Sequence, residues 1–113
     1  MKYIQTTVVP DEAYNYFLAT LSNRNRIKML NQLMDGPKNV SQLTDAIGVD
    51  QSTVSNHLAR LRLCGFVSVK PNGQERVYHI NKETTEPLMK LINLHTTKYC
   101  INCIQRKKKG GQK

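Results

Sequence analysis

Four small polar side chains lie close together in the middle of the chain, at a spacing that could read the bases of DNA. They are Gln51, Ser52, Ser55 and Asn56. Hydroxyl and amide groups fit the major groove and can reach base edges, while a helix N-terminus favours nearby phosphate. Thr53 lies at the margin of the same face. The alternative interpretation is a helical hairpin whose polar face only meets solvent.

Basic and amide side chains follow this group along the chain. Four of them are expected to hold backbone phosphate: Arg60, Arg62, Lys70 and Arg76. Asn72 and Gln74 could follow the backbone or enter the minor groove. His57 has two interpretations, because it could contact a phosphate or fill the space between its helix and the strands that follow. No oxyanion donor set or phosphate loop accompanies Asp50, Ser52 and His57, so an enzyme is not expected.

A second group with possible chemistry lies in the segment HTTKYCINC near the C-terminus. Its Cys-x-x-Cys pair, Cys100 and Cys103, offers two soft ligands that Zn²⁺, Cd²⁺, Cu(I) or As(III) could bridge. His95 is roughly 12 Å along a straight helix from Cys103. It could join one ion only if the helix ends after Tyr99, or if a partner chain supplies it. Two alternatives remain open, which are a redox dithiol and two ordinary cysteines beside an interface histidine.

Apolar periodicity predicts the helices that position these side chains. The first helix begins after Pro10. The second runs from the cap Ser22 to Gly36-Pro37, the third from the cap Ser41 to Gly48, and the fourth from the cap Asp50 to Gly65. The fourth helix covers about 51–63. Because only two residues separate Gly48 from Gln51, the third and fourth helices must meet at a sharp angle, which is the spacing of a helix-turn-helix.

A β-hairpin and a final helix are predicted after this unit. Two β-rich runs flank an Asn-Gly turn and form a wing over about 66–80. The last helix covers about 84–104. The basic segment 106–113 is expected to be disordered, and it either tracks phosphates or only raises non-specific affinity. We therefore expect one domain over 1–105, with residues 1–10 as an N-terminal arm.

The charge is concentrated in one part of the chain. Of the 113 residues, 17 are Lys or Arg and 8 are Asp or Glu, and residues 51–113 hold the whole formal charge of +9. A one-sided basic excess indicates a polyanionic partner, nucleic acid before membrane. No apolar run approaches the roughly 20 residues of a bilayer span, and no signal peptide is visible, so we expect a cytoplasmic protein. Three cysteines argue against a disulfide scaffold.

The stretch from Leu21 to Ile80 resembles the ArsR/SmtB family of small dimeric winged-helix repressors. The segments QSTVSNHL, LRLCGFV and RVYHI carry the likeness. The resemblance implies a homodimer built from the first and last helices, and a near-palindromic operator released when an inducer binds. The sequence departs from the family at Arg24, where proline is frequent, and at Asn56, where histidine is common.

The family's usual metal ligands are not matched. The third helix has no cysteine, and the last helix lacks the Asp-x-His start that the family uses for zinc. Cys100, Cys103 and His95 remain as the candidate inducer site, and no metal is expected to be needed for folding. The alternative is a winged-helix regulator of DNA with no metal inducer, either constitutive or responsive to thiol oxidation. A module that binds protein instead of DNA is a third possibility, which the basic C-terminal half disfavours.

The apolar stripe of the last helix supports a dimer independently of the resemblance. The apolar core between Ser22 and Ile80 already forms a complete unit, so an unpaired stripe would expose more apolar surface than monomers usually tolerate. A two-fold dimer would present two recognition helices to successive major grooves, roughly 34 Å apart. The predicted fold is mainly α with a β-hairpin wing, a winged helix-turn-helix that dimerises through its first and last helices.

Overall fold

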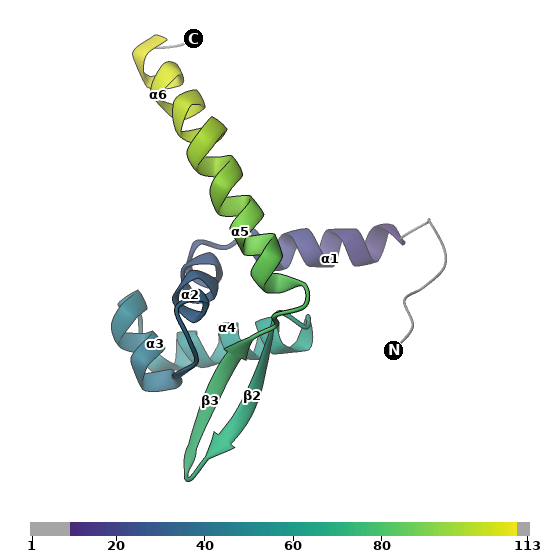
Figure 1. Cartoon of the computed structure of the whole chain (residues 1–113), viewed down its shortest axis with the longest axis vertical. Coiled ribbons are helices and arrows are strands. Elements are labelled where there is room, and N and C mark those ends of the chain that lie inside the picture. The colour runs from purple at the N-terminus through teal and green to yellow at the C-terminus, as the bar shows by residue number, and fades with distance from the viewer. Residues whose placement is uncertain (1–9, 111–113) are drawn as a thin grey trace.

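The computed structural model describes residues 10–110 of the chain. Its elements are α1 (Asp11–Leu21), α2 (Arg24–Met34), β1 (Lys38–Asn39), α3 (Val40–Ile47), α4 (Gln51–Leu63), β2 (Val67–Asn72), β3 (Glu75–Ile80), α5 (Thr85–His95), the π-helical turn η1 (Thr96–Cys100) and α6 (Ile101–Gly110). Helices dominate, and β2 and β3 form a hairpin below α4 (Figure 1). The predicted fold class, mainly α with a β-hairpin wing, is confirmed. Of the predicted N-terminal arm, all but Pro10 lies outside the described residues.

The helix-turn-helix is formed by α3 and α4, and local hydrogen bonds define its ends. Asn39 and Gln42 form a reciprocal capping box at the start of α3, so this helix begins at Val40 and not after the predicted cap Ser41. Gly48 ends α3 with φ +82°, a conformation that glycine adopts without a Cβ penalty. Asp50 then caps α4, as predicted. The turn between the two helices is therefore defined by two short-range features, Gly48 and Asp50.

The wing is a two-stranded hairpin with a third, two-residue strand at its side. β2 and β3 pair antiparallel from Val67 opposite Ile80 to Asn72 opposite Glu75. The turn between them contains Gly73 at φ +66°. The sequence did not predict β1, which pairs with β3 and makes the sheet order β1-β3-β2. This short strand ties the segment before α3 to the wing.

The core lies where α2, α3, α4 and α5 meet the base of the wing. Its buried apolar side chains are Met29, Leu30, Leu33, Leu43, Val54, Leu58, Leu61, Phe66, Val67, Tyr78, Ile80 and Met89. Helix α1 contributes none of them, and its one buried residue is Thr20. The Phe17 ring stacks on Phe66 with centroids 5.5 Å apart. Helix α1 therefore lies on the body of the protein without entering its core.

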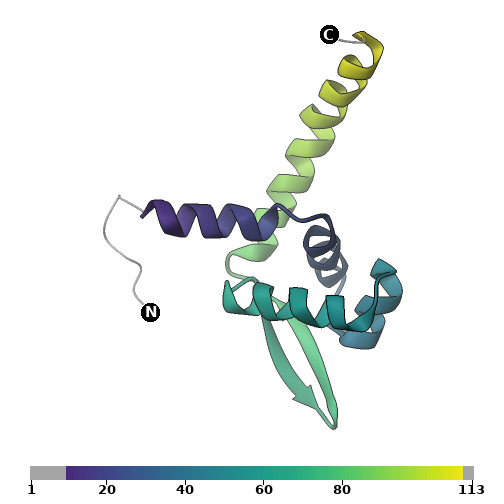
Figure 2. The same cartoon turned by 180° about the vertical axis from the view of Figure 1, so that it is seen from behind.

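A long helical arm leaves the body at the C-terminal end of the described chain. Helices α5 and α6 run through η1 without a break and project away from α1–α4 (Figures 1 and 2). The sequence predicted a disordered segment from residue 106, whereas the helix continues to Gly110. Arg106, Lys107 and Lys108 are good helix formers, and no glycine or proline interrupts them, which accounts for the difference. No helix in the described part of the chain is long and apolar enough to cross a bilayer.

Candidate nucleic-acid interface

Helix α4 has one apolar face and one polar face. Val54, Leu58 and Leu61 are fully buried against the other helices. The opposite face of its first two turns is exposed and carries the four side chains predicted to read bases, Gln51, Ser52, Ser55 and Asn56. The structure thus brings the predicted base-reading residues together on one outward surface. Thr53, predicted at the margin of this face, is half-buried.

Asp50 organises the first turn of α4. The Ser52 hydroxyl donates to its Oδ2 at 2.5 Å, the Thr53 hydroxyl to its Oδ1 at 2.6 Å, and the Thr53 N–H to Oδ2 at 3.1 Å. These bonds, the one from Ser52 foremost, lower the pKa of Asp50 to about 2. The hydroxyl protons of Ser52 and Thr53 are therefore directed to Asp50. Gln51 and Asn56 keep amide groups that make no hydrogen bond within the described chain.

Arg62 and Arg76 line one groove between α4 and the wing. Both are exposed, and with Val69 and Pro71 they line a groove of about 280 Å³. None of the described residues that line this groove is acidic. Two guanidinium groups from different elements that face one groove suit a phosphate oxygen, because each can donate two parallel hydrogen bonds. The other wing residues predicted to contact DNA, Lys70, Asn72 and Gln74, are exposed along the hairpin and its tip.

Arg60 does not face outward as the sequence suggested. Its Nε donates to Thr20 Oγ1 at 2.9 Å, and its guanidinium lies 4.1 Å from the centroid of the Tyr16 ring. The side chain is half-buried against α1. Sequence patterns do not predict this contact, because Arg60 and Thr20 are 40 residues apart. The structure therefore places this arginine between helices, where it packs on α1.

His57 lies on the same side of α4 as Arg60, where α4 meets α1 and α2. Its Nδ1 is 3.1 Å from Arg26 Nη1, and burial followed by the charge of Arg26 lowers the pKa of the imidazole. Arg26 also donates from Nε to the Thr20 carbonyl at 2.6 Å and from Nη2 to the Ala19 carbonyl at 3.2 Å. We call Tyr16, Thr20, Arg26, His57 and Arg60 the α1–α4 polar cluster. Sequence reasoning missed Arg26, Thr20 and Tyr16, because the contacts join separate helices.

The candidate thiol site lies on the projecting arm. Cys100 and Cys103 are free cysteines, half-buried and exposed respectively, and residues three apart on a helix have Cβ atoms about 5–6 Å apart. The pair could bridge one soft ion. His95 is exposed and packs against Tyr99, with ring centroids 5.0 Å apart. The sequence predicts that His95 can join Cys103 at one ion within one chain only if the helix ends after Tyr99. The helix continues past Tyr99, so a single chain does not bring the two residues together.

The described residues contain no cluster of three or more histidine, cysteine, aspartate or glutamate side chains that could hold a metal. A single protomer therefore offers two thiolates to a soft ion, and a third ligand would have to come from a second chain. The third free cysteine, Cys64, is half-buried at the C-terminal end of α4.

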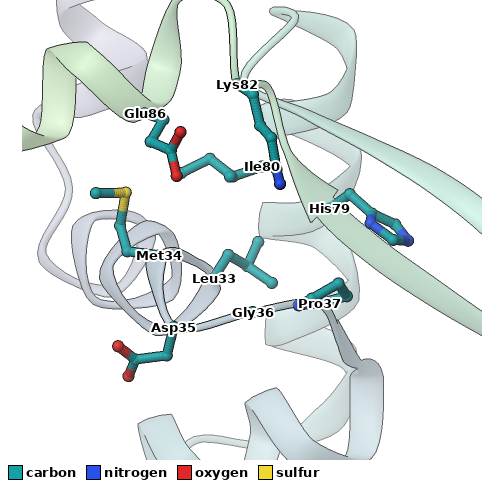
Figure 3. Close-up of a pocket in the computed structure, with 9 residues that line it drawn as sticks. All are labelled: Leu33, Met34, Asp35, Gly36, Pro37, His79, Ile80, Lys82 and Glu86. Carbon is teal, nitrogen blue, oxygen red and sulfur yellow. The ribbon is translucent and has the colours of Figure 1, made fainter.

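A separate cavity of about 240 Å³ lies between the end of α2, the end of β3 and the start of α5. Figure 3 shows Glu86 and Lys82 on either side of Ile80, while Asp35 and His79 point away from the centre. None of its lining residues belongs to the predicted DNA or thiol sites. The groups present do not converge on one point, so the cavity adds no functional group to those sites.

Comparison with known proteins agrees with this geometry. Residues 23–69 match the sequence pattern described as bacterial regulatory protein, arsR family. The transcriptional repressor PagR of Bacillus anthracis is 38% identical over 79 residues, which cover 67% of this chain and 77% of PagR. A probable mercury resistance operon repressor of Streptomyces lividans is 29% identical over 82 residues, which cover 73% of this chain and 65% of that protein.

Among solved structures, HlyU from Vibrio cholerae N16961 superposes with a TM-score of 0.67 at 28% identity, covering 80% of this chain and 95% of HlyU. The fold and the exposed polar face of α4 define a winged helix-turn-helix transcriptional regulator that binds DNA. The chain belongs to the arsR family of bacterial regulatory proteins.

Proposed function

We propose that the protein is a homodimeric transcriptional repressor that acts by binding a near-palindromic operator with α4 in the major groove. The observation that carries this proposal is the outward face of α4, where exposed amide and hydroxyl groups occupy the first two turns of a 13-residue helix. Gln51 and Asn56 carry amides of the kind that bind adenine through two hydrogen bonds. Ser55 adds a hydroxyl donor and acceptor, and Ser52, whose proton is directed to Asp50, adds an acceptor.

The backbone contacts of this proposal come from the groove between α4 and the wing. Arg62 and Arg76 hold one stretch of phosphate, and Lys70 holds the next along the hairpin. Asn72 and Gln74 reach the minor groove from the tip. Thr53 supports the base-reading face by hydrogen-bonding to Asp50. Such contacts position the protein on the duplex without selecting sequence.

A second copy of the chain covers the apolar side chains of α1 and of the C-terminal arm. Besides Tyr16, whose ring Arg60 covers, the large exposed apolar residues on these two elements are Tyr14, Leu18, Leu91, Leu94, Tyr99, Ile101 and Ile104. Monomeric proteins rarely expose a continuous apolar surface of this extent. A two-fold dimer buries it and sets the two α4 helices about 34 Å apart, one turn of the duplex.

The inducer of this repressor is a thiophilic metal or metalloid held by Cys100 and Cys103. Support comes from the spacing of two free thiols on one helix and from the relative named as a mercury resistance operon repressor. In a dimer the partner could add its own thiols or His95. Because the thiols lie on the arm that forms the interface, binding there would favour one dimer shape over another and change the separation of the α4 helices.

The test begins with selection of duplex DNA from random oligonucleotides by the purified protein. Enrichment of an inverted repeat is expected, and enrichment of no sequence would contradict the repressor proposal. The selected duplex is then titrated in gel shifts with Zn²⁺, Cd²⁺, Cu(I), Hg²⁺ and arsenite. Release is expected for the wild type and for the control Cys64→Ser, but not for the double variant Cys100→Ser/Cys103→Ser.

A parallel arm with oxidant and then dithiothreitol identifies a thiol-redox regulator. If oxidant releases the DNA reversibly while none of the metals does, the pair is a redox switch and the metal proposal is wrong. If neither has any effect, the protein represses without an inducer at these thiols.

A further inference from the structure

The α1–α4 polar cluster joins three helices that are distant in sequence. Arg26 projects from the first turn of α2 and donates to the carbonyl groups of Ala19 and Thr20 in the last turn of α1. Carbonyl groups in the last turn of a helix have no partner within that helix and carry its partial negative charge. The guanidinium therefore caps α1. The same guanidinium reaches His57 on α4, so one side chain links the end of α1 to the recognition helix.

Arg60 makes a second link between α1 and α4. The Thr20 hydroxyl, which is fully buried, donates to the Tyr16 carbonyl at 2.8 Å and accepts from Arg60 Nε at 2.9 Å. The guanidinium of Arg60 covers the Tyr16 ring. In both views of the molecule, α4 lies between α1 and the wing (Figures 1 and 2). The cluster thus holds the inner side of the helix whose outer side carries the base-reading residues.

The contact between Arg26 and His57 requires a neutral imidazole. Arginine has only donors, so Nδ1 of His57 must accept and the ring proton must be on Nε2. The charged group that faces His57 is Arg26 from α2, and Arg26 in turn lies beside Arg60 of α4 and Tyr16 of α1. Two of these three groups are cations and none is a carboxylate. Protonation would remove the acceptor and place a third positive charge in the cluster.

We propose that Arg26 and His57 are positioning residues for DNA binding, which fix the recognition helix α4 against α1 and do so only while His57 is neutral. This inference rests on the proposed function, because it concerns the helix that enters the major groove. The predicted effect of His57 protonation on DNA affinity has a distinctive direction. A histidine that contacts phosphate strengthens DNA binding when it becomes protonated, whereas protonation of His57 in this cluster weakens binding.

The experiment measures affinity for the selected duplex by fluorescence anisotropy between pH 7.5 and 5.5, at constant ionic strength and with a metal chelator and reductant present. This window lies around and below the ordinary histidine pKa of about 6.5. Because the pKa of His57 lies below that value, wild-type affinity is expected to fall severalfold, with most of the fall in the part of the window closest to pH 5.5. The variant His57→Gln supplies a neutral acceptor, and its affinity should stay within about threefold of the wild-type value at pH 7.5 and change little with pH.

Two further variants separate positioning from general effects. His79→Gln removes the half-buried histidine of the wing and should keep the wild-type pH profile. Arg26→Lys keeps the charge but cannot reach both α1 carbonyls and His57 at once, so affinity should fall at every pH with an unchanged dependence on salt. An affinity that rises towards pH 5.5, with the rise lost in His57→Gln, would show that His57 contacts phosphate. A flat wild-type profile would equally overturn the inference.

A second measurement needs no DNA and therefore separates this inference from the proposed function. Hydrogen exchange of the α1 amides, corrected for the intrinsic effect of pH, should show reduced protection in the wild type at pH 5.5 and unchanged protection in His57→Gln. Equal loss in both proteins, or no loss in either, contradicts the link between His57 and α1. If no DNA sequence is enriched while this pattern of exchange is found, the proposed function fails and the cluster keeps a purely structural role.

Discussion

Replacing Arg62 by glutamine removes one cation from the groove between α4 and the wing without disturbing the core, because the side chain is exposed. If Arg62 neutralises one phosphate in each protomer of a bound dimer, the variant releases two fewer counterions on binding. The logarithm of the association constant then falls less steeply with the logarithm of salt concentration, by about 1.8 in slope. Between about 50 and about 200 mM salt, the affinity ratio of wild type to variant should shrink about twelvefold.

The matched control is Arg60→Gln, which removes one positive charge from the same helix, two residues before Arg62. The guanidinium of Arg60 is engaged with Thr20 and Tyr16, so it should release no counterion on DNA binding. Loss of this contact lowers affinity through the position of α4, by a factor that does not change with salt. The assay is fluorescence anisotropy with the selected duplex over a series of salt concentrations.

The result that refutes this reasoning is an equal reduction in slope for the two variants. That outcome would mean that Arg60 leaves the Tyr16 ring and reaches phosphate in the complex. An unchanged slope for Arg62→Gln would mean that the groove beside the wing does not hold phosphate, and the docking of the wing on the duplex would need to be redrawn.

Three other changes test the fold and the assembly. Asp50→Asn keeps an oxygen cap on α4, but the asparagine cannot titrate. Because the pKa of Asp50 is lowered to about 2, the wild type should lose stability as pH falls from about 4 to about 2. Urea unfolding should show that the variant loses less stability over the same pH range. Gly48→Ala should cost about 1–2 kcal/mol of unfolding free energy, because the added Cβ meets no atom within 4 Å and the cost comes only from φ +82°; Gly48→Asn should cost less. The double variant Leu91→Glu/Leu94→Glu should be a monomer in sedimentation velocity. The control Lys90→Glu, which changes another exposed residue of α5, should remain dimeric. A dimer in both cases would place the interface elsewhere.

The parts of the fold that sequence reasoning located are those that local chemistry determines. The ends of α3 and α4 depend on Gly48 and Asp50, which act on residues within one turn. The wing follows from alternating β-formers around an Asn-Gly turn. The exposed polar face of α4 was predicted because the buried stripe of Val54 and Leu58 determines which residues of α4 face outward.

The parts that were missed depend on contacts between distant segments. Arg60 looks like a phosphate-binding residue in sequence, and only the position of α1 shows that Tyr16 and Thr20 engage it. Strand β1 has two residues and exists because Tyr78 and Val77 of the wing pair with it. Basic composition predicted disorder after residue 105, although lysine and arginine are also good helix formers when a helix already leads into them.

The wide turn at residues 96–100 determines the direction of the two thiols. A π turn holds about one residue more than an α turn, so the side chains after it are set back by nearly the arc of one residue, about 100°. On an unbroken α-helix, Cys103 would lie within about 60° of the side of the arm that carries Leu88 and Ile92, which pack against the core, so the wide turn rotates the pair of thiols relative to that side. Shortening that turn by a single residue would rotate both sulfur atoms about a quarter of a circle while leaving the Cys-x-x-Cys sequence intact. The orientation of the thiols is thus encoded in the length of the chain that precedes them.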